Sequence, residues 1–204
     1  DGIPAASSVM FGTFPSLSPA LIISLGINTA GKLFFSFLIV AKSVTITTDA
    51  AIFSDGAASS WSHVALVWTR VGDSDAGTGV IYVNGSAVAA TTTGAGITGT
   101  QQDGATFGSG EYNIGYLDSA TGGASNFYLG EMDEFAFFRE ALTASGISEI
   151  YNSGVPTDLT LGGSNFSATN LELYYRFEDD FTDTTGTSDG TGVNSPTFTT
   201  DVPE

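Results

Sequence analysis

Residues 61–70, WSHVALVWTR, and 79–88, GVIYVNGSAV, decide the fold class of this 204-residue chain. In the first segment successive side chains alternate between two faces, with Val64, Leu66 and Trp68 on one of them, which is the period of a β-strand. In the second, two apolar runs flank Asn84-Gly85, the strongest short-range signal of a β-hairpin. These two segments predict antiparallel sheet.

Most other segments are also short runs of β-branched or aromatic residues, bounded by Gly, Asp, Asn or Ser. Turn signals at this spacing favour a sandwich over alternating strands and helices. The sequence therefore predicts an all-β fold, a two-sheet antiparallel jelly-roll sandwich. We expect strands at residues 7–12, 20–27, 32–40, 43–48, 62–71, 78–84, 86–91, 110–117, 126–138, 171–178 and 193–199.

One segment departs from the strand pattern. Residues 139–154, REALTASGISEIYNSG, carry apolar side chains at near-helical spacing and predict one short helix near 143–152. Thr143 suits the N-cap position, and Gly154 suits the C-terminal stop before Pro156.

Composition excludes several classes of function. The net charge is −17, with only five Lys and Arg residues, so the surface lacks the basic patches that bind nucleic acid. The apolar runs at 20–27 and 33–40 are far shorter than the roughly 20 residues of a membrane-spanning helix, so we expect no membrane insertion. Without cysteine there is neither a disulfide nor thiolate chemistry.

Three blocks together resemble the laminin-G-like jelly roll of the concanavalin A-like lectin and glucanase superfamily. The first comprises residues 61–70 and 79–88, which are similar to the Trp-x-His-Val-Ala strand and the Tyr-Val-Asn-Gly hairpin of that family. The second comprises 113–116 and 127–154, and the third is 174–191, YYRFEDDFTDTTGTSDGT, which resembles the opening block of such modules. The resemblance implies the jelly-roll fold, an extracellular setting and lectin-like or adhesive roles.

The order of the blocks departs from the family, because the opening block closes this chain. We therefore divide the chain into a body, 1–170, and a strand with an acidic turn, 171–204, that pairs internally or with an adjacent copy. The apolar side of the strand is formed by Leu171, Leu173, Tyr175 and Phe177. Because the end of the chain reads smoothly into its beginning, as in a repeat excised from an array, the sequence favours pairing with a neighbouring copy.

The resemblance extends to glycoside hydrolases, so the carboxylates of GEMDEF, residues 130–135, were compared with a catalytic strand. Retaining glycosidases need two carboxyl groups about 5–5.5 Å apart. On a strand Glu131 and Asp133 would share a face, but the next position on that face is Phe135, and Glu134 would point the other way. We therefore expect no enzyme, and a role for Asp133 and Glu134 in fixing the neighbouring loop. Glycoside hydrolase remains a remote alternative.

His63 is the only histidine, and there is no cysteine to complete a zinc site with it. The resemblance implies a structural role for His63 beside Trp61.

Two candidate binding sites remain. Residues 178–204 carry seven carboxylates and no Lys or Arg, and hard oxygen ligands on a Gly-rich turn suit Ca²⁺. The candidate calcium ligands are Asp179, Asp183 and Asp189. Aromatic rings near the long loops suit stacking on sugars, although rings on strands usually belong to the core. The candidate glycan-binding residues are Tyr112, Tyr116 and Tyr128, with Phe127 beside them.

The sequence thus favours a non-catalytic extracellular module on a cell or virion surface. It would assemble with copies of itself, head to tail, by β-strand complementation, as in a filament or adhesin. The alternative is a Ca²⁺-dependent carbohydrate-binding module.

Overall fold

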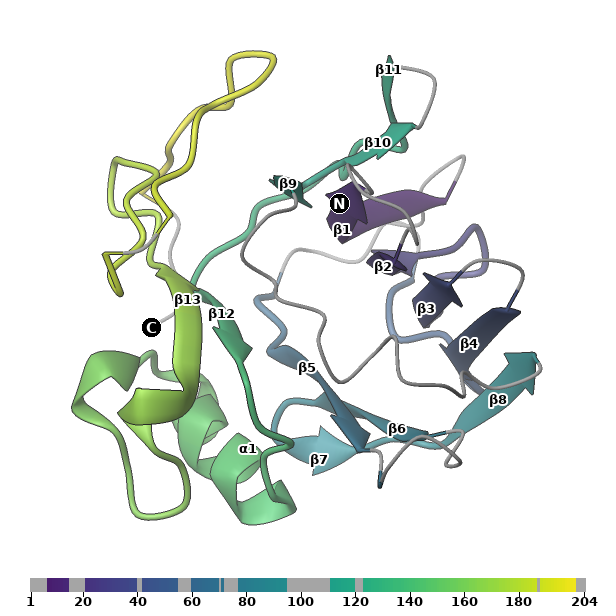
Figure 1. The fold of residues 1–204 in the computed structure, drawn as a ribbon, viewed down its shortest axis with the longest axis horizontal. Helices are drawn as coiled ribbons and strands as arrows, with labels where there is room; N and C mark the ends of the chain where they lie inside the picture. Colours follow the sequence, from purple (N-terminus) through teal and green to yellow (C-terminus); the bar gives the residue numbers. More distant parts are fainter. Residues whose placement is uncertain are drawn as a thin grey trace. The chain divides into compact units, whose positions relative to one another are not determined.

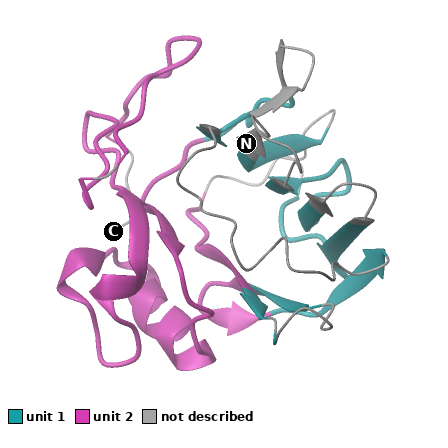
Figure 2. Cartoon of the chain, viewed as in Figure 1, with its two compact units in different colours: residues 1–59, 68–81, 88–130 teal, residues 60–67, 82–87, 131–204 magenta. Residues whose placement is uncertain are grey.

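The computed structural model describes residues 7–14, 21–39, 42–54, 60–69, 71, 77–94, 111–119, 123–186 and 188–200. By its residue contacts the chain divides into two compact units, coloured separately in Figure 2. Unit 1 contains residues 1–59, 68–81 and 88–130, and unit 2 contains 60–67, 82–87 and 131–204.

Unit 1 is built on a six-stranded antiparallel sheet (Figure 1). The strand order is β8-β4-β3-β2-β1-β9, so four consecutive strands form a meander with β8 and β9 at its edges. The strands are β1 (Ser8–Phe14), β2 (Leu21–Ile27), β3 (Leu33–Ile39), β4 (Lys42–Thr48), β8 (Ala90–Gly94) and β9 (Glu111–Ile114). A short hairpin of β10 (Leu117–Ser119) and β11 (Gly123–Ser125) follows.

The alternation of each strand explains one apolar face of this sheet. Val44 and Ile46 of β4 are 2% and 1% exposed, and Ile46 lies opposite the buried Phe35 of β3. Phe37 and Trp68 pack against Val44, with the two rings 4.6 Å apart. Removal of these apolar side chains from water is the main favourable term in folding.

A three-stranded sheet consists of β5 (Val64–Thr69), β6 (Thr78–Val83) and β7 (Ser86–Ala87). Its strands β6 and β7 form the predicted hairpin. Asn84 and Gly85 form its turn with φ of 48° and 74°, the left-handed pair that a two-residue hairpin requires. The Asn84 side chain also accepts from the backbone N–H of His63, at 3.0 Å.

Unit 2 contains the only α-helix of the described residues, α1 (Ala144–Tyr151), confirming the predicted short helix. Thr143 is its N-cap and accepts from the Gly146 N–H at 3.1 Å. The C-cap is Asn152, in the left-handed conformation, two residues before the predicted Gly154. Ile147 and Leu142 lie in a core that includes Tyr82, Phe166 and Tyr174.

After three 3₁₀ turns, η2 (Asn152–Gly154), η3 (Leu159–Leu161) and η4 (Ala168–Asn170), the chain enters β13 (Leu171–Tyr175). This strand pairs antiparallel with β12 (Phe135–Phe138) of the same chain. The sequence favours a neighbouring copy because the end of the chain reads smoothly into its beginning, and pairing between copies stays a prediction. In the structure the connection 155–170 is fixed: Phe166 is buried, and the Glu149 carboxylate accepts from the backbone N–H groups of Ser164 and Asn165.

The fold class predicted from the sequence is confirmed: the chain is mostly β, in antiparallel sheets, with one short helix, as in a β-sandwich jelly roll. One predicted strand is too long and another is wrong. Residues 126–134 are irregular, and only Phe135–Phe138 of the segment 126–138 pairs as a strand. Residues 193–199 contain no strand, because Asn194 and Ser195 both take positive φ, which interrupts an extended run.

Candidate functional site

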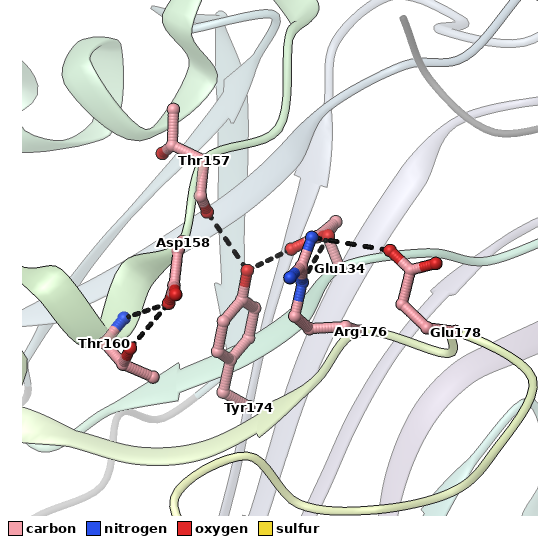
Figure 3. A network of polar contacts seen from close by, with 7 residues as sticks. All are labelled: Glu134, Thr157, Asp158, Thr160, Tyr174, Arg176 and Glu178. Atoms are coloured by element: carbon pink, nitrogen blue, oxygen red, sulfur yellow. Dashed lines mark hydrogen bonds and ion pairs between the residues drawn. The ribbon is translucent and has the colours of Figure 1, made fainter.

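Glu134 stands at the centre of a polar network in unit 2 (Figure 3). Its carboxylate accepts from the hydroxyl of Tyr174 and, at 3.2 Å, from Nε of Arg176. Arg176 also reaches Oε1 of Glu178 at 3.4 Å, and the Tyr174 hydroxyl lies 3.0 Å from the carbonyl oxygen of Thr157. Burial, followed by the hydrogen bond to Glu134, raises the pKa of Tyr174, so the phenol stays protonated.

This network agrees with the expectation that Glu134 fixes its surroundings. Glu134 takes φ of 52°, an unusual conformation for a residue with a side chain, and the ion pair with Arg176 joins the end of β13 to the residue before β12. The hydrogen bond that Arg176 donates to Glu134, followed by the charge of Glu134, raises the pKa of Arg176. We interpret the network as a cross-link between the two strands.

β12 begins only at Phe135, so Glu131 and Asp133 do not lie on a strand. The expectation that they share a strand face with Phe135 is therefore wrong. Glu131 is exposed, and Asp133 is half-buried. Burial raises the pKa of Asp133, and the charge of Glu134 raises it further. Both oxygens of the Glu134 carboxylate accept hydrogen bonds, from Tyr174 and Arg176, so we assign Glu134 to the cross-link between the strands.

The predicted calcium ligand Asp183 is buried and surrounded by hydrogen-bond donors of the protein. It is 1% exposed, and its carboxylate accepts four hydrogen bonds from the protein. Oδ1 accepts from the N–H of Tyr174 at 2.9 Å and of Thr185 at 3.1 Å. Oδ2 accepts from the Thr185 hydroxyl at 2.7 Å and the Ser188 N–H at 3.1 Å. A carboxylate has about four lone-pair positions, so protein donors fill all of them.

Asp189 lies beside Asp183 and accepts from its N–H at 3.0 Å. Asp179 is exposed, with φ of 64°. Burial, followed by the charges of Asp183 and Asp189, raises the pKa of Tyr175. No three acidic or histidine side chains among the described residues are grouped so that they would hold a metal ion. The calcium site stays a prediction, and Asp183 would have to release a protein donor to serve it.

The predicted assembly strand is buried on both faces. Leu171, Leu173 and Tyr175 are buried as expected, and Tyr174, on the opposite side of the strand, is 0% exposed. Phe177 lies beyond the strand with φ of 57°, and its ring stacks on that of Tyr175 at 5.9 Å.

The candidate glycan-binding rings separate into two groups in unit 1. Tyr112 stacks on the buried Phe11 at 6.2 Å, which places it on the apolar face of the sheet. Tyr116 instead stacks on Phe127, with centroids 5.9 Å apart and an interplanar angle of 29°. Phe127 is 43% exposed, and Leu129 beside it is 74% exposed. Tyr128 is half-buried and donates its N–H to the Gly115 carbonyl oxygen at 2.7 Å.

A row of small residues, all but one of them polar, crosses the whole six-stranded sheet and was not predicted from the sequence. Strand register places the row on the face opposite Val44 and Ile46. Its members, one per strand from β8 to β9, are Thr93, Thr45, Ser36, Ser24, Gly12 and Asn113. The row changes from exposed at Thr93 to buried at Asn113, whose Nδ2 has no hydrogen-bond acceptor among the described residues. No local sequence pattern marks the row, because its members lie on six different strands and only the strand register aligns them.

A family model, the concanavalin A-like lectin/glucanases superfamily, matches residues 2–148, which is most of the chain. The chain belongs to this superfamily. Its match to the laminin-G-like branch agrees with the resemblance carried by the hairpin and by the segment around α1. Searches of curated proteins and of solved structures each found no significant match.

Laminin-G-like domains are generally non-catalytic and typically extracellular. Within the described residues, no helix has the length and apolar character needed to cross a membrane.

Proposed function

We propose that this laminin-G-like domain is a non-catalytic glycan-binding module of an extracellular surface, with Tyr116 and Phe127 as its sugar-stacking residues. The stacked pair of Tyr116, which is half-buried, and Phe127, which is exposed, carries the proposal. An aromatic ring offers a flat apolar face to the C–H groups of a sugar ring, and apolar side chains left at a surface often mark a binding site.

The polar row supports the same function. The hydroxyls of Ser36 and Thr45 lie 2.8 Å apart, and Thr93 continues the row into solvent. Hydroxyl groups both donate and accept, as sugar hydroxyls do. A glycan is therefore the class of ligand that both the aromatic pair and the row suit.

Assembly with other copies remains the second candidate. Strand complementation through β13 is disfavoured by its pairing with β12, so an assembling chain would have to use another edge or open this one. On cell or virion surfaces either function would suit a module of this family.

The test is a glycan array probed with the wild-type chain and two variants, with and without EDTA. We expect Phe127→Ala to lose binding and Leu129→Ala to retain it, since both remove an exposed apolar side chain but only the first removes a ring. Loss of binding in EDTA would make the recognition Ca²⁺-dependent. Equal binding by wild type and Phe127→Ala, or none by the wild type, contradicts the proposal.

A further inference from the structure

The stacked rings of Tyr116 and Phe127, here called the ring pair, are held on a fixed backbone. Gly115, which precedes the first ring, donates its N–H to a carbonyl oxygen of β1 at 2.8 Å. The carbonyl oxygen of Asn126, which precedes the second ring, accepts from an N–H of β1 at 2.8 Å. Bonds to one strand therefore position both rings before a ligand arrives, and a preorganised site loses less entropy on binding.

The segments that carry and hold the ring pair contain no cation. These segments are residues 8–14, 111–119 and 123–130, and their only charged residues are Glu111 and Asp118, both acidic. The whole chain has a net charge of −17, with five Lys and Arg residues. A sialylated or sulfated glycan would meet like charge in these segments and no ion-pair partner, whereas a neutral sugar is not repelled.

Asn126 supplies an uncharged polar group directly before Phe127. It is exposed and takes φ of 55°, a left-handed conformation in which asparagine is enriched. A side-chain amide both donates and accepts, so it can pair with a sugar hydroxyl in either direction. Leu129 is 74% exposed and lies two residues after Phe127, so the two Cα atoms are within about 7 Å of each other. The exposed groups of this segment are thus an amide, a ring and an aliphatic chain, and all three are neutral.

We propose that the ring pair takes neutral glycans and rejects anionic ones, and that the Asn126 amide binds a hydroxyl of the sugar that stacks on Phe127. The inference rests on the proposed function, because it concerns the same site. A sugar without carboxylate or sulfate groups places its C–H face on the ring and needs no cation. Its binding comes from ring contact and a neutral hydrogen bond, which salt screens little.

The experiment compares neutral oligosaccharides with their sialylated and sulfated derivatives, so that the members of each pair differ only in the charged group. We expect the wild type to bind the neutral member at least about tenfold more tightly than the anionic one, since like charges oppose the latter. Between about 50 mM and about 500 mM NaCl, affinity for the neutral member should change less than about twofold, because no ion pair is screened.

A cation placed beside the ring pair should admit the anionic glycans. Leu129→Lys brings an ammonium group within reach of a sugar on Phe127 and is expected to raise affinity for the anionic members about tenfold at low salt. The gain should be lost at high salt. Val155→Lys is the matched control, because it adds the same charge at another exposed apolar residue, 48% exposed, and is expected to match the wild type.

The role of Asn126 is tested without disturbing its backbone. Asn126→Gly removes the amide and keeps the left-handed conformation, which glycine adopts without steric cost. We expect affinity for the neutral glycan to fall about fivefold, the effect of one lost hydrogen bond, while the melting temperature stays that of the wild type. Unchanged affinity in Asn126→Gly would assign the asparagine to its backbone conformation alone and overturn its role in binding.

The outcomes separate this inference from the proposed function. Equal binding of the neutral and anionic members, or a preference for the anionic ones, overturns the charge selectivity and leaves glycan binding standing. A wild type that binds no member of any pair overturns both. A Leu129→Lys chain that gains no more than Val155→Lys overturns the position of the sugar beside Phe127.

Discussion

The backbone N–H of Tyr174 donates to Oδ1 of Asp183 across 2.9 Å, which joins the most buried residue of β13 to a carboxylate nine positions later. Both residues are almost completely inaccessible to water, at 0% and 1% exposure. A buried carboxylate is tolerated only where donors replace its lost hydration, and Asp183 has four of them. Its position in the fold is therefore structural, whatever else the acidic segment binds.

The first prediction concerns Asp183 and calcium together. Asp183→Ala leaves four donors without their acceptor and is expected to lower the free energy of unfolding by about 3 kcal/mol. Because the carboxylate is filled by protein donors, we expect the same loss in millimolar Ca²⁺ and in EDTA. Urea titrations in both buffers measure this, with Asp180→Ala as the exposed control. A loss confined to the Ca²⁺ buffer would instead make Asp183 a calcium ligand.

The contrast between Asp183 and the hairpin shows which features a sequence reveals. Asn84-Gly85 and Thr143 act through backbone groups within a few residues, so local pattern predicted the turn and the N-cap. The four donors to Asp183 include Tyr174, which only the fold brings close. From sequence alone the aspartate appeared as one of many carboxylates in an acidic loop.

The same distinction explains the error at residues 126–134. Their apolar and aromatic residues resemble a long strand. In the structure Glu134 takes φ of 52°, and its carboxylate binds Arg176, 42 residues later in the chain. That non-local contact overrides the local preference for extended backbone. The polar row was likewise invisible until strand register aligned Ser36, Thr45 and Thr93.

The second prediction is that Glu134 and Tyr174 are energetically coupled. Tyr174→Phe removes the hydroxyl bonded to Glu134, and Glu134→Gln removes the charge, with an expected loss of about 1–3 kcal/mol each. Because one contact is removed twice, the double variant should lose less than the sum. A double-mutant cycle from urea unfolding measures the coupling, expected to be about 1 kcal/mol. Strict additivity would show that the contact between Tyr174 and Glu134 contributes nothing.

The third prediction is a pH dependence carried by His63. Burial lowers the pKa of His63 below its ordinary 6.5, and Nδ1 has no hydrogen-bond partner among the described residues. The unfolded chain therefore binds more protons than the native one as pH falls below about 6.5, so stability is lost in that direction. The contribution of the neutral His63 to stability is fully present above that pH. Unfolding titrations between about pH 5 and 7 should show a slope that His63→Gln reduces. An unchanged slope would assign the pH dependence to carboxylates.

The last prediction separates backbone strain from packing at the hairpin turn. Gly85 has φ of 74°, and a Cβ built there would lie 2.7 Å from Cδ1 of Tyr151, the last residue of α1. Gly186 has a nearly equal φ of 77°, but nothing lies within 4 Å of its Cβ position. Alanine at either site adds the strain of a left-handed residue, about 1–2 kcal/mol. Only at Gly85 does it also press on a ring of unit 2.

We therefore expect Gly85→Ala to lose more stability than Gly186→Ala, by a further 1–3 kcal/mol or so, the range for overpacking. Tyr151→Ala in the Gly85→Ala background should recover part of the difference, because it removes the ring that the new methyl group meets. Thermal unfolding of the four chains measures both effects. Equal losses of stability at Gly85 and Gly186 would mean that Tyr151 moves away from the new methyl group at little cost. The hairpin would then not depend on its contact with Tyr151.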